Sequence, residues 1–139
     1  MQWYQEYYIG VPEIDKQHRQ LIQAVNRVSD IYREKDNERN RRICIEAIKY
    51  LKSYTLNHFS DEEAFQRSIG YEDYENHKKI HDDFVQTVIE YEKILQEQNY
   101  SSESVQKFIS ICSKWISHHI LNEDQKIVGK PPVSLSSLH

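Results

Sequence analysis

The chain has 139 residues, with 18 Lys and Arg against 22 Asp and Glu, and its formal net charge is −4. This length suits one domain with its own core, and the scattered charge gives no sign of a nucleic-acid surface. No segment approaches the roughly 20 apolar residues of a membrane span, and the N-terminus lacks a leader pattern, so we expect a soluble cytoplasmic protein. Two cysteines are too few for a disulfide framework, whereas seven histidines are unusual for so short a chain.

Glycine and proline are scarce, at three each, which favours long helices and an all-α fold. Residues 1–14 are rich in aromatic side chains and contain Gly10 and Pro12, so we expect an irregular N-terminal arm. Asp15 is placed as the N-cap of the first helix. From His18 to Tyr32, inward positions recur at steps of three and four, the spacing of one helical face.

Three more helices are predicted by the same spacing. The second follows a face from Cys44 to Ile69 and ends at Gly70, and the third runs from Tyr74 to Leu95. Ser101 caps the fourth, which reaches His119. The tail covers residues 125–139, and little regular structure is expected in it after Gly129. Short connections make successive helices antiparallel, so residues 1–139 are predicted to form one domain whose up-down-up-down four-helix bundle covers about residues 15–124.

The predicted inward faces carry six polar side chains. One such histidine would most simply be a core residue with a hydrogen-bond partner, but burying each polar group without a partner costs roughly 2–7 kcal/mol. In an antiparallel bundle the helices bring these positions to a similar height, so a single shared cluster is expected. Its members are His18, His58, Glu62, His77, His81 and His119.

Imidazoles with a minority of carboxylates favour Fe, Zn, Cu or Ni over Ca or Mg. Five histidines are too many for one tetrahedral zinc ion, so we expect two adjacent metal ions bridged by a carboxylate. The segment HKKIH, residues 77–81, has Lys78 where a metalloprotease helix carries its glutamate base. The Glu-x-x-His motif of the di-iron carboxylate proteins is also absent.

Near the end of the fourth helix stand two pairs of adjacent polar residues, His118–His119 and Glu123–Asp124, and only one member of each pair can face the interior. His119 continues the face of Cys112 and Trp115, so helical spacing turns its neighbour His118 away. From His119 the same spacing favours Glu123, four residues on, whereas Asp124 would lie off that face in a regular helix.

Four segments resemble, in order, the signatures of the hemerythrins, and in particular of the bacteriohemerythrins. They are GVPEIDKQHRQL (10–21), HFSDEE (58–63), GYEDYENHKKIHDDF (70–84) and WISHHILNED (115–124). The resemblance implies a non-haem di-iron centre inside a four-helix bundle, with an oxo or hydroxo bridge between the irons and reversible O₂ binding.

Carried over by position, the resemblance implies that three histidines hold one iron and two hold the other, which keeps a coordination position open for O₂. The first set is His77, His81 and His119, the second is His18 and His58, and Glu62 and Asp124 bridge the irons. The resemblance thus favours Asp124 over Glu123, which requires the helix to unwind, bulge or end near Asn122. Gln66 departs from the family, which commonly has methionine there.

The resemblance also implies that four apolar residues line the O₂ pocket, namely Leu21, Phe59, Trp115 and Ile120. The alternative for each of them is plain core packing. We expect a protein that binds O₂ for storage, delivery or sensing rather than a catalyst. The alternatives are an enzyme that reduces peroxide or nitric oxide at the same centre, and an iron-binding or iron-responsive protein. No nucleic-acid or membrane partner is expected, while a protein partner and the oligomeric state stay open.

Overall fold

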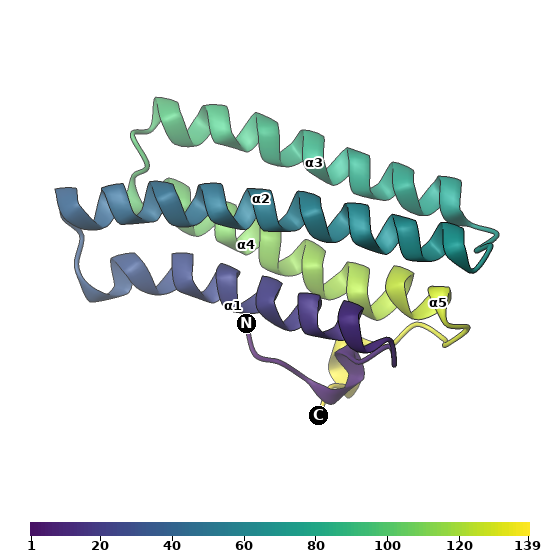
Figure 1. Cartoon of the computed structure of the whole chain (residues 1–139). Coiled ribbons are helices and arrows are strands. Elements are labelled where there is room, and N and C mark those ends of the chain that lie inside the picture. Colours follow the sequence, from purple (N-terminus) through teal and green to yellow (C-terminus); the bar gives the residue numbers. More distant parts are fainter.

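The structure, a computed structural model of residues 1–139, contains four long helices and no strand. Successive helices run in opposite directions and pack side by side (Figure 1). They are α1 (Pro12–Glu34), α2 (Glu38–Ser68), α3 (Tyr74–Glu97) and α4 (Ser102–His119). The predicted all-α four-helix bundle is therefore confirmed, and no helix has the length and apolar character needed to span a membrane.

The start of α1 differs from the prediction, because the helix begins at Pro12 and its N-cap is Val11, not Asp15. Proline suits the first turn, where its missing N–H would have no partner within the helix. Asp15 instead lies inside that turn, where its carboxylate accepts hydrogen bonds from the backbone N–H of Ile9 at 2.8 Å and of Gly10 at 3.1 Å. Asp15 therefore fastens the N-terminal arm to α1.

The other helix ends follow local sequence signals. The side chain of Asn37 accepts a hydrogen bond from the Asn40 N–H at the start of α2, and Ser101 caps α4 as predicted. Gly70 follows α2 with φ +65, a conformation that favours glycine. The Tyr71 N–H then bonds back to the Gln66 carbonyl at 2.9 Å, which closes the helix and turns the chain toward α3.

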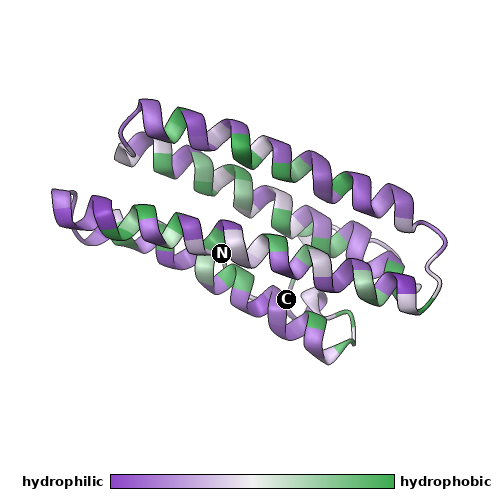
Figure 2. Cartoon of the chain, turned by 45° about the horizontal axis from the view of Figure 1, so that its top comes forward, coloured by the Kyte–Doolittle hydropathy of each residue, from purple (hydrophilic) through white to green (hydrophobic).

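The apolar faces of the four helices meet in one core. Figure 2 shows apolar and hydrophilic residues interspersed along each helix, as expected when one face is buried and the other is exposed. Cys44 and Cys112 are both free and buried, and burial raises the pKa of Cys44 to about 11 and that of Cys112 to about 12. Both thiols are therefore protonated at neutral pH and unreactive.

Beyond α4 the chain continues in short helical turns. A five-residue π turn, η2 (Ile120–Asp124), continues the line of α4 and leads into α5 (Gln125–Ile127). Short 3₁₀ turns lie in the arm at η1 (Gln5–Tyr7) and in the tail at η3 (Leu135–Ser137). The N-terminus lies against the middle of α1, where Met1 bonds the side chain of Asn26, and the C-terminus lies beside the arm, where the His139 N–H bonds Glu6 (Figure 1).

Replacing Asp15 with alanine removes the acceptor of two backbone N–H groups, those of Ile9 and Gly10. The expected loss is about 1–3 kcal/mol of unfolding free energy, because Asp15 and Ile9 are buried and the freed donors lose their partner. Urea unfolding of the metal-free protein measures it. Asp30→Ala, which removes an exposed carboxylate from the same helix, serves as the control and should change little. Equal effects of the two substitutions would contradict the fastening role of Asp15.

Candidate metal centre

Seven polar side chains from all four helices converge at one end of the bundle, and each is at most 3% exposed. The six inward residues predicted from helical spacing are all among them, and the seventh, Asp124, comes from the π turn. We call this set the seven-residue centre. Its members are His18 from α1, His58 and Glu62 from α2, His77 and His81 from α3, His119 from α4, and Asp124.

The centre divides into two overlapping groups of candidate ligand atoms, and within each group these atoms lie within 4.8 Å of one another. Glu62 and Asp124 belong to both groups. One group adds His77, His81 and His119, and the other adds His18 and His58. Two carboxylates shared between two sets of imidazoles are the arrangement expected for a pair of adjacent, bridged metal ions.

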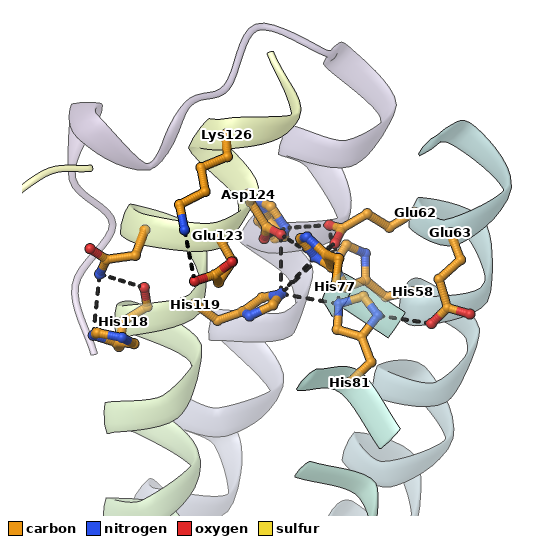
Figure 3. A network of polar contacts seen from close by, with 12 residues as sticks. His58, Glu62, Glu63, His77, His81, His118, His119, Glu123, Asp124 and Lys126 are labelled. Atoms are coloured by element: carbon orange, nitrogen blue, oxygen red, sulfur yellow. Dashed lines mark hydrogen bonds and ion pairs between the residues drawn. The ribbon is translucent and has the colours of Figure 1, made fainter. Parts of the chain in front are cut away.

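Distances in the three-histidine group fit ligands around one ion. The Nε2 atom of His77 lies 2.9 Å from Glu62 Oε1 and 3.1 Å from Asp124 Oδ1. The Nε2 atom of His119 lies 3.1 Å from that of His77 and 3.0 Å from that of His81 (Figure 3). Ligand atoms about 2.1 Å from an ion and at right angles to each other are about 3.0 Å apart.

The two-histidine group is similar but has fewer nitrogen donors. The Nε2 atom of His18 lies 3.0 Å from Asp124 Oδ2 and 3.3 Å from Glu62 Oε2. The Nε2 atom of His58 also lies 3.3 Å from Glu62 Oε2. This position therefore offers two imidazoles and two carboxylates, one nitrogen donor fewer than the other group.

Hydrogen bonds outside the centre fix the rings of two of the histidines. Nδ1 of His58 lies 2.8 Å from the Gln17 amide oxygen, and Nδ1 of His81 lies 2.8 Å from a Glu63 carboxylate oxygen. Because these acceptors require a proton on Nδ1, each Nε2 keeps its lone pair and directs it into the centre. Figure 3 shows Glu63 on the side of His81 that faces away from the other ligand candidates.

Several atoms at the middle of the centre have no hydrogen-bond partner. Buried atoms of this kind include Nε2 of His18, Oε2 of Glu62 and both carboxylate oxygens of Asp124. Lone pairs that converge without donors between them require positive charge, either as protons or as metal ions. The buried, unpartnered nitrogen and oxygen atoms of these residues therefore fit a pair of metal ions.

Without metal, protons balance the two buried carboxylates. Burial by itself lowers the pKa of a histidine, but the neighbouring Asp124 and Glu62 outweigh it and raise the pKa of His18 to about 9 and that of His77 to about 10. Burial opposes ionisation of Glu62, yet the surrounding histidines hold its pKa well below the usual range. Burial dominates at His58 and lowers its pKa. Metal binding must therefore displace protons from the centre.

The π turn decides which acid reaches the centre. Residue i+5 follows residue i around a π turn, so Asp124 takes the inward position that Glu123 would hold in a regular helix after His119. Glu123 turns away from the centre, with Lys126 Nζ 3.3 Å from its Oε1, and His118 is exposed (Figure 3). The expected local departure near Asn122 is confirmed.

The arm and the tail support this π turn. The Leu121 carbonyl, inside the turn, accepts a hydrogen bond from the backbone N–H of Val133 at 3.0 Å. The Gln125 amide donates to the Glu6 carbonyl at 2.8 Å, and the hydroxyl of Tyr7 lies 2.9 Å from that of Ser117 on α4. The position of Asp124 therefore depends on segments from both ends of the sequence.

Aromatic rings pack against the histidines. Phe59 stacks on His81, with ring centroids 3.8 Å apart, and Trp115 stacks on His119 at 4.3 Å. Phe84 is stacked in turn on Trp115, with ring centroids 4.0 Å apart. Leu21 and Ile120 are buried in the core. The role of Leu21, Phe59, Trp115 and Ile120 in lining an O₂ pocket stays a prediction.

Sequence reasoning missed the contributions of Gln17 and Phe84. Gln17 adjoins His18 in sequence but serves His58 on the neighbouring helix, so helical spacing gives no signal for it. Phe84 lies on the predicted inward face of α3 and was read only as core. Glu63 lies beside the predicted inward face of α2, and its contact with Nδ1 of His81 makes it a support for that ring.

Comparison with known proteins agrees with this geometry. Residues 9–130 match the family model described as "Hemerythrin HHE cation binding domain". The chain is 30% identical to a bacteriohemerythrin of Pseudomonas aeruginosa, over 98% of this chain and 84% of that protein. It is also 30% identical to a myohemerythrin of Theromyzon tessulatum, over 93% of this chain and 92% of that protein. The matched region contains the whole seven-residue centre.

The adjacent histidines of α4 provide a matched pair of variants. We expect His119→Ala to lose metal from the three-histidine group, because its Nε2 lies among the candidate ligand atoms. His118 is exposed, and its Nδ1 lies 3.2 Å from the Asn122 amide nitrogen, so His118→Ala should keep the full metal content. Elemental analysis of the metal bound per chain measures both. Equal loss in the two variants would contradict the assignment.

The raised pKa values of His18 and His77 give the metal-free protein a definite pH dependence. Their protons stabilise the fold fully below the unfolded pKa of 6.5, and this stabilisation is lost as pH rises through about 9 and 10. The thermal unfolding midpoint of the metal-free protein should therefore fall from pH 6.5 to pH 10. His77→Gln should reduce that fall, and His118→Gln should retain it. A midpoint that rises over this range would contradict the charge balance described above.

Proposed function

Because the chain belongs to the hemerythrin family, we propose that its seven-residue centre holds two iron ions and that the protein binds O₂ reversibly. The observation that supports this most is the unequal division of donors between two groups that share Glu62 and Asp124. With one further bridging ligand from solvent, the three-histidine position would be six-coordinate and the two-histidine position five-coordinate. The second iron would then keep one position open for O₂.

The protein side chains have distinct roles in this proposal. One iron would be held by His77, His81 and His119, and the other by His18 and His58. Glu62 and Asp124, which belong to both groups, would serve both irons. When bound, the iron pair supplies the electrons that reversible O₂ binding requires. Gln17 and Glu63 keep the rings of His58 and His81 in the orientation and tautomer that present Nε2 to iron.

The apolar surroundings favour carriage of O₂ over chemistry on it. Leu21, Phe59 and Ile120 are buried, and the half-buried Trp115 is stacked on His119. In the proposed pocket these side chains exclude water, which limits the supply of protons that a reduction of O₂ or peroxide would consume. Storage, delivery and sensing of O₂ are all compatible with such a site.

The proposal is tested by loading the protein with Fe(II) in the absence of air, adding O₂, removing it, and following the visible absorption. We expect two irons per chain and a colour that appears with O₂ and disappears on its removal. His58→Ala removes one of two nitrogen donors at the proposed O₂ position, so it should abolish the reversible colour. Irreversible oxidation with turnover of peroxide or nitric oxide would support an enzyme instead. Absence of iron uptake would contradict both functions.

A further inference from the structure

Gln66 is a polar side chain buried in the bundle without a partner. It lies on α2, is 0% exposed, and neither its amide nitrogen nor its amide oxygen has a hydrogen-bond partner in the protein. A buried amide left without a hydrogen-bond partner destabilises the folded state, because its interactions with water are lost and not replaced. The apolar methionine common at this position in the family would carry no such cost, so Gln66 calls for a partner that is not itself part of the chain.

Gln66 adjoins the seven-residue centre on the side of the α2–α3 turn. Residues four apart on a helix are neighbours, so Gln66 follows Glu62 on the same inward face. Glu62 Oε1 in turn lies 2.9 Å from His77 Nε2. Tyr71 contacts both Gln66 and His77. Its N–H bonds to the Gln66 carbonyl at 2.9 Å, and its ring lies edge-on to that of His77, with centroids 6.3 Å apart.

His77 lacks the orienting partner that two other histidines have. Its Nε2 faces Glu62 and Asp124, so a lone pair there requires the proton to be on Nδ1. That Nδ1 is buried and has no hydrogen-bond partner in the protein. At His58 the amide oxygen of Gln17 accepts the hydrogen bond from Nδ1–H. A glutamine amide is therefore already used in this centre to orient a histidine.

We propose that Gln66 holds an internal water between α2 and α3, and that this water accepts a hydrogen bond from the Nδ1–H of His77 and donates one to the Gln66 amide oxygen. The Gln66 amide and Nδ1 of His77 are both buried without a hydrogen-bond partner, and one water between them would satisfy both. The imidazole and the amide together offer the two to four polar partners that a buried water needs. Gln66 is then a positioning residue that fixes the tautomer of His77. Its effect on iron rests on the proposed function, whereas the water itself does not.

Crystal structures of the wild-type protein and of Gln66→Met, each with and without iron, test the water directly. In the wild type we expect one water within about 3.2 Å of both the Gln66 amide and Nδ1 of His77, in both states. Gln66→Met should lack it. A wild-type structure without this water, or with the water on another histidine, would overturn the proposal.

Release of Fe(II) to a chelator in the absence of air tests the positioning role. We expect about tenfold faster release from Gln66→Met than from the wild type, the loss typical when a partner of a metal ligand is removed. Leu95→Met, a change of similar size in the core near the end of α3, should release iron at the wild-type rate. The iron-free Gln66→Met protein should unfold at or above the wild-type temperature, which separates faster release from poor folding.

Wild-type release rates in Gln66→Met would contradict the positioning role. Neither measurement uses O₂, and the crystal structures without iron do not require iron binding, so failure of the Gln66 proposal can be distinguished from failure of the proposed function. A water found as expected in a protein that does not bind O₂ reversibly would contradict the proposed function alone. Reversible O₂ binding in a protein without the water would contradict only the role of Gln66.

Discussion

Two buried carboxylates, Glu62 and Asp124, impose the constraint on which the rest of the structure depends. Both are 0% exposed, and ionised groups taken out of water are tolerated only when they are closely compensated. Compensation comes from imidazoles on all four helices, so each helix must keep the register that brings its nitrogen about 3 Å from a shared oxygen or a neighbouring ring. The centre thus fixes how the helices are aligned as well as what they can bind, and protons and metal ions compete for the same positions.

The helices and most of the centre could be predicted from sequence because both follow from periodic spacing. Polar side chains that interrupt an apolar face every three or four residues must point inward with it, and antiparallel neighbours then bring His58 and Glu62 opposite His77 and His81. Asp124 could not be placed this way. Its position requires a π turn, and that turn is supported by contacts with the arm and the tail, such as the bond between Leu121 and Val133. The family resemblance selected Asp124 where helical geometry favoured Glu123.

The errors and omissions share a physical cause, which is that tertiary contacts redirect side chains with strong local preferences. Aspartate is a residue type that often caps helices, but the carboxylate of Asp15 instead accepts hydrogen bonds from the N–H groups of Ile9 and Gly10. Gln17 has no periodic signature because it acts across the helix pair on His58. Residues that orient ligands lie beside the inward face rather than on it, so a search for inward polar groups finds the ligand candidates and misses their supports.

The hydrogen bonds that hold the π turn have a consequence for how such proteins diverge. Asp124 is joined to the N-terminal arm and the C-terminal tail only through neighbours such as Leu121 and Gln125. The arm and tail are the parts of the chain least bound by helical periodicity, and so the freest to change during evolution. A change in the arm or the tail can therefore alter the reach and angle of the Asp124 carboxylate while all seven polar residues stay the same. Substitutions outside the centre thus reach it through the backbone of the π turn.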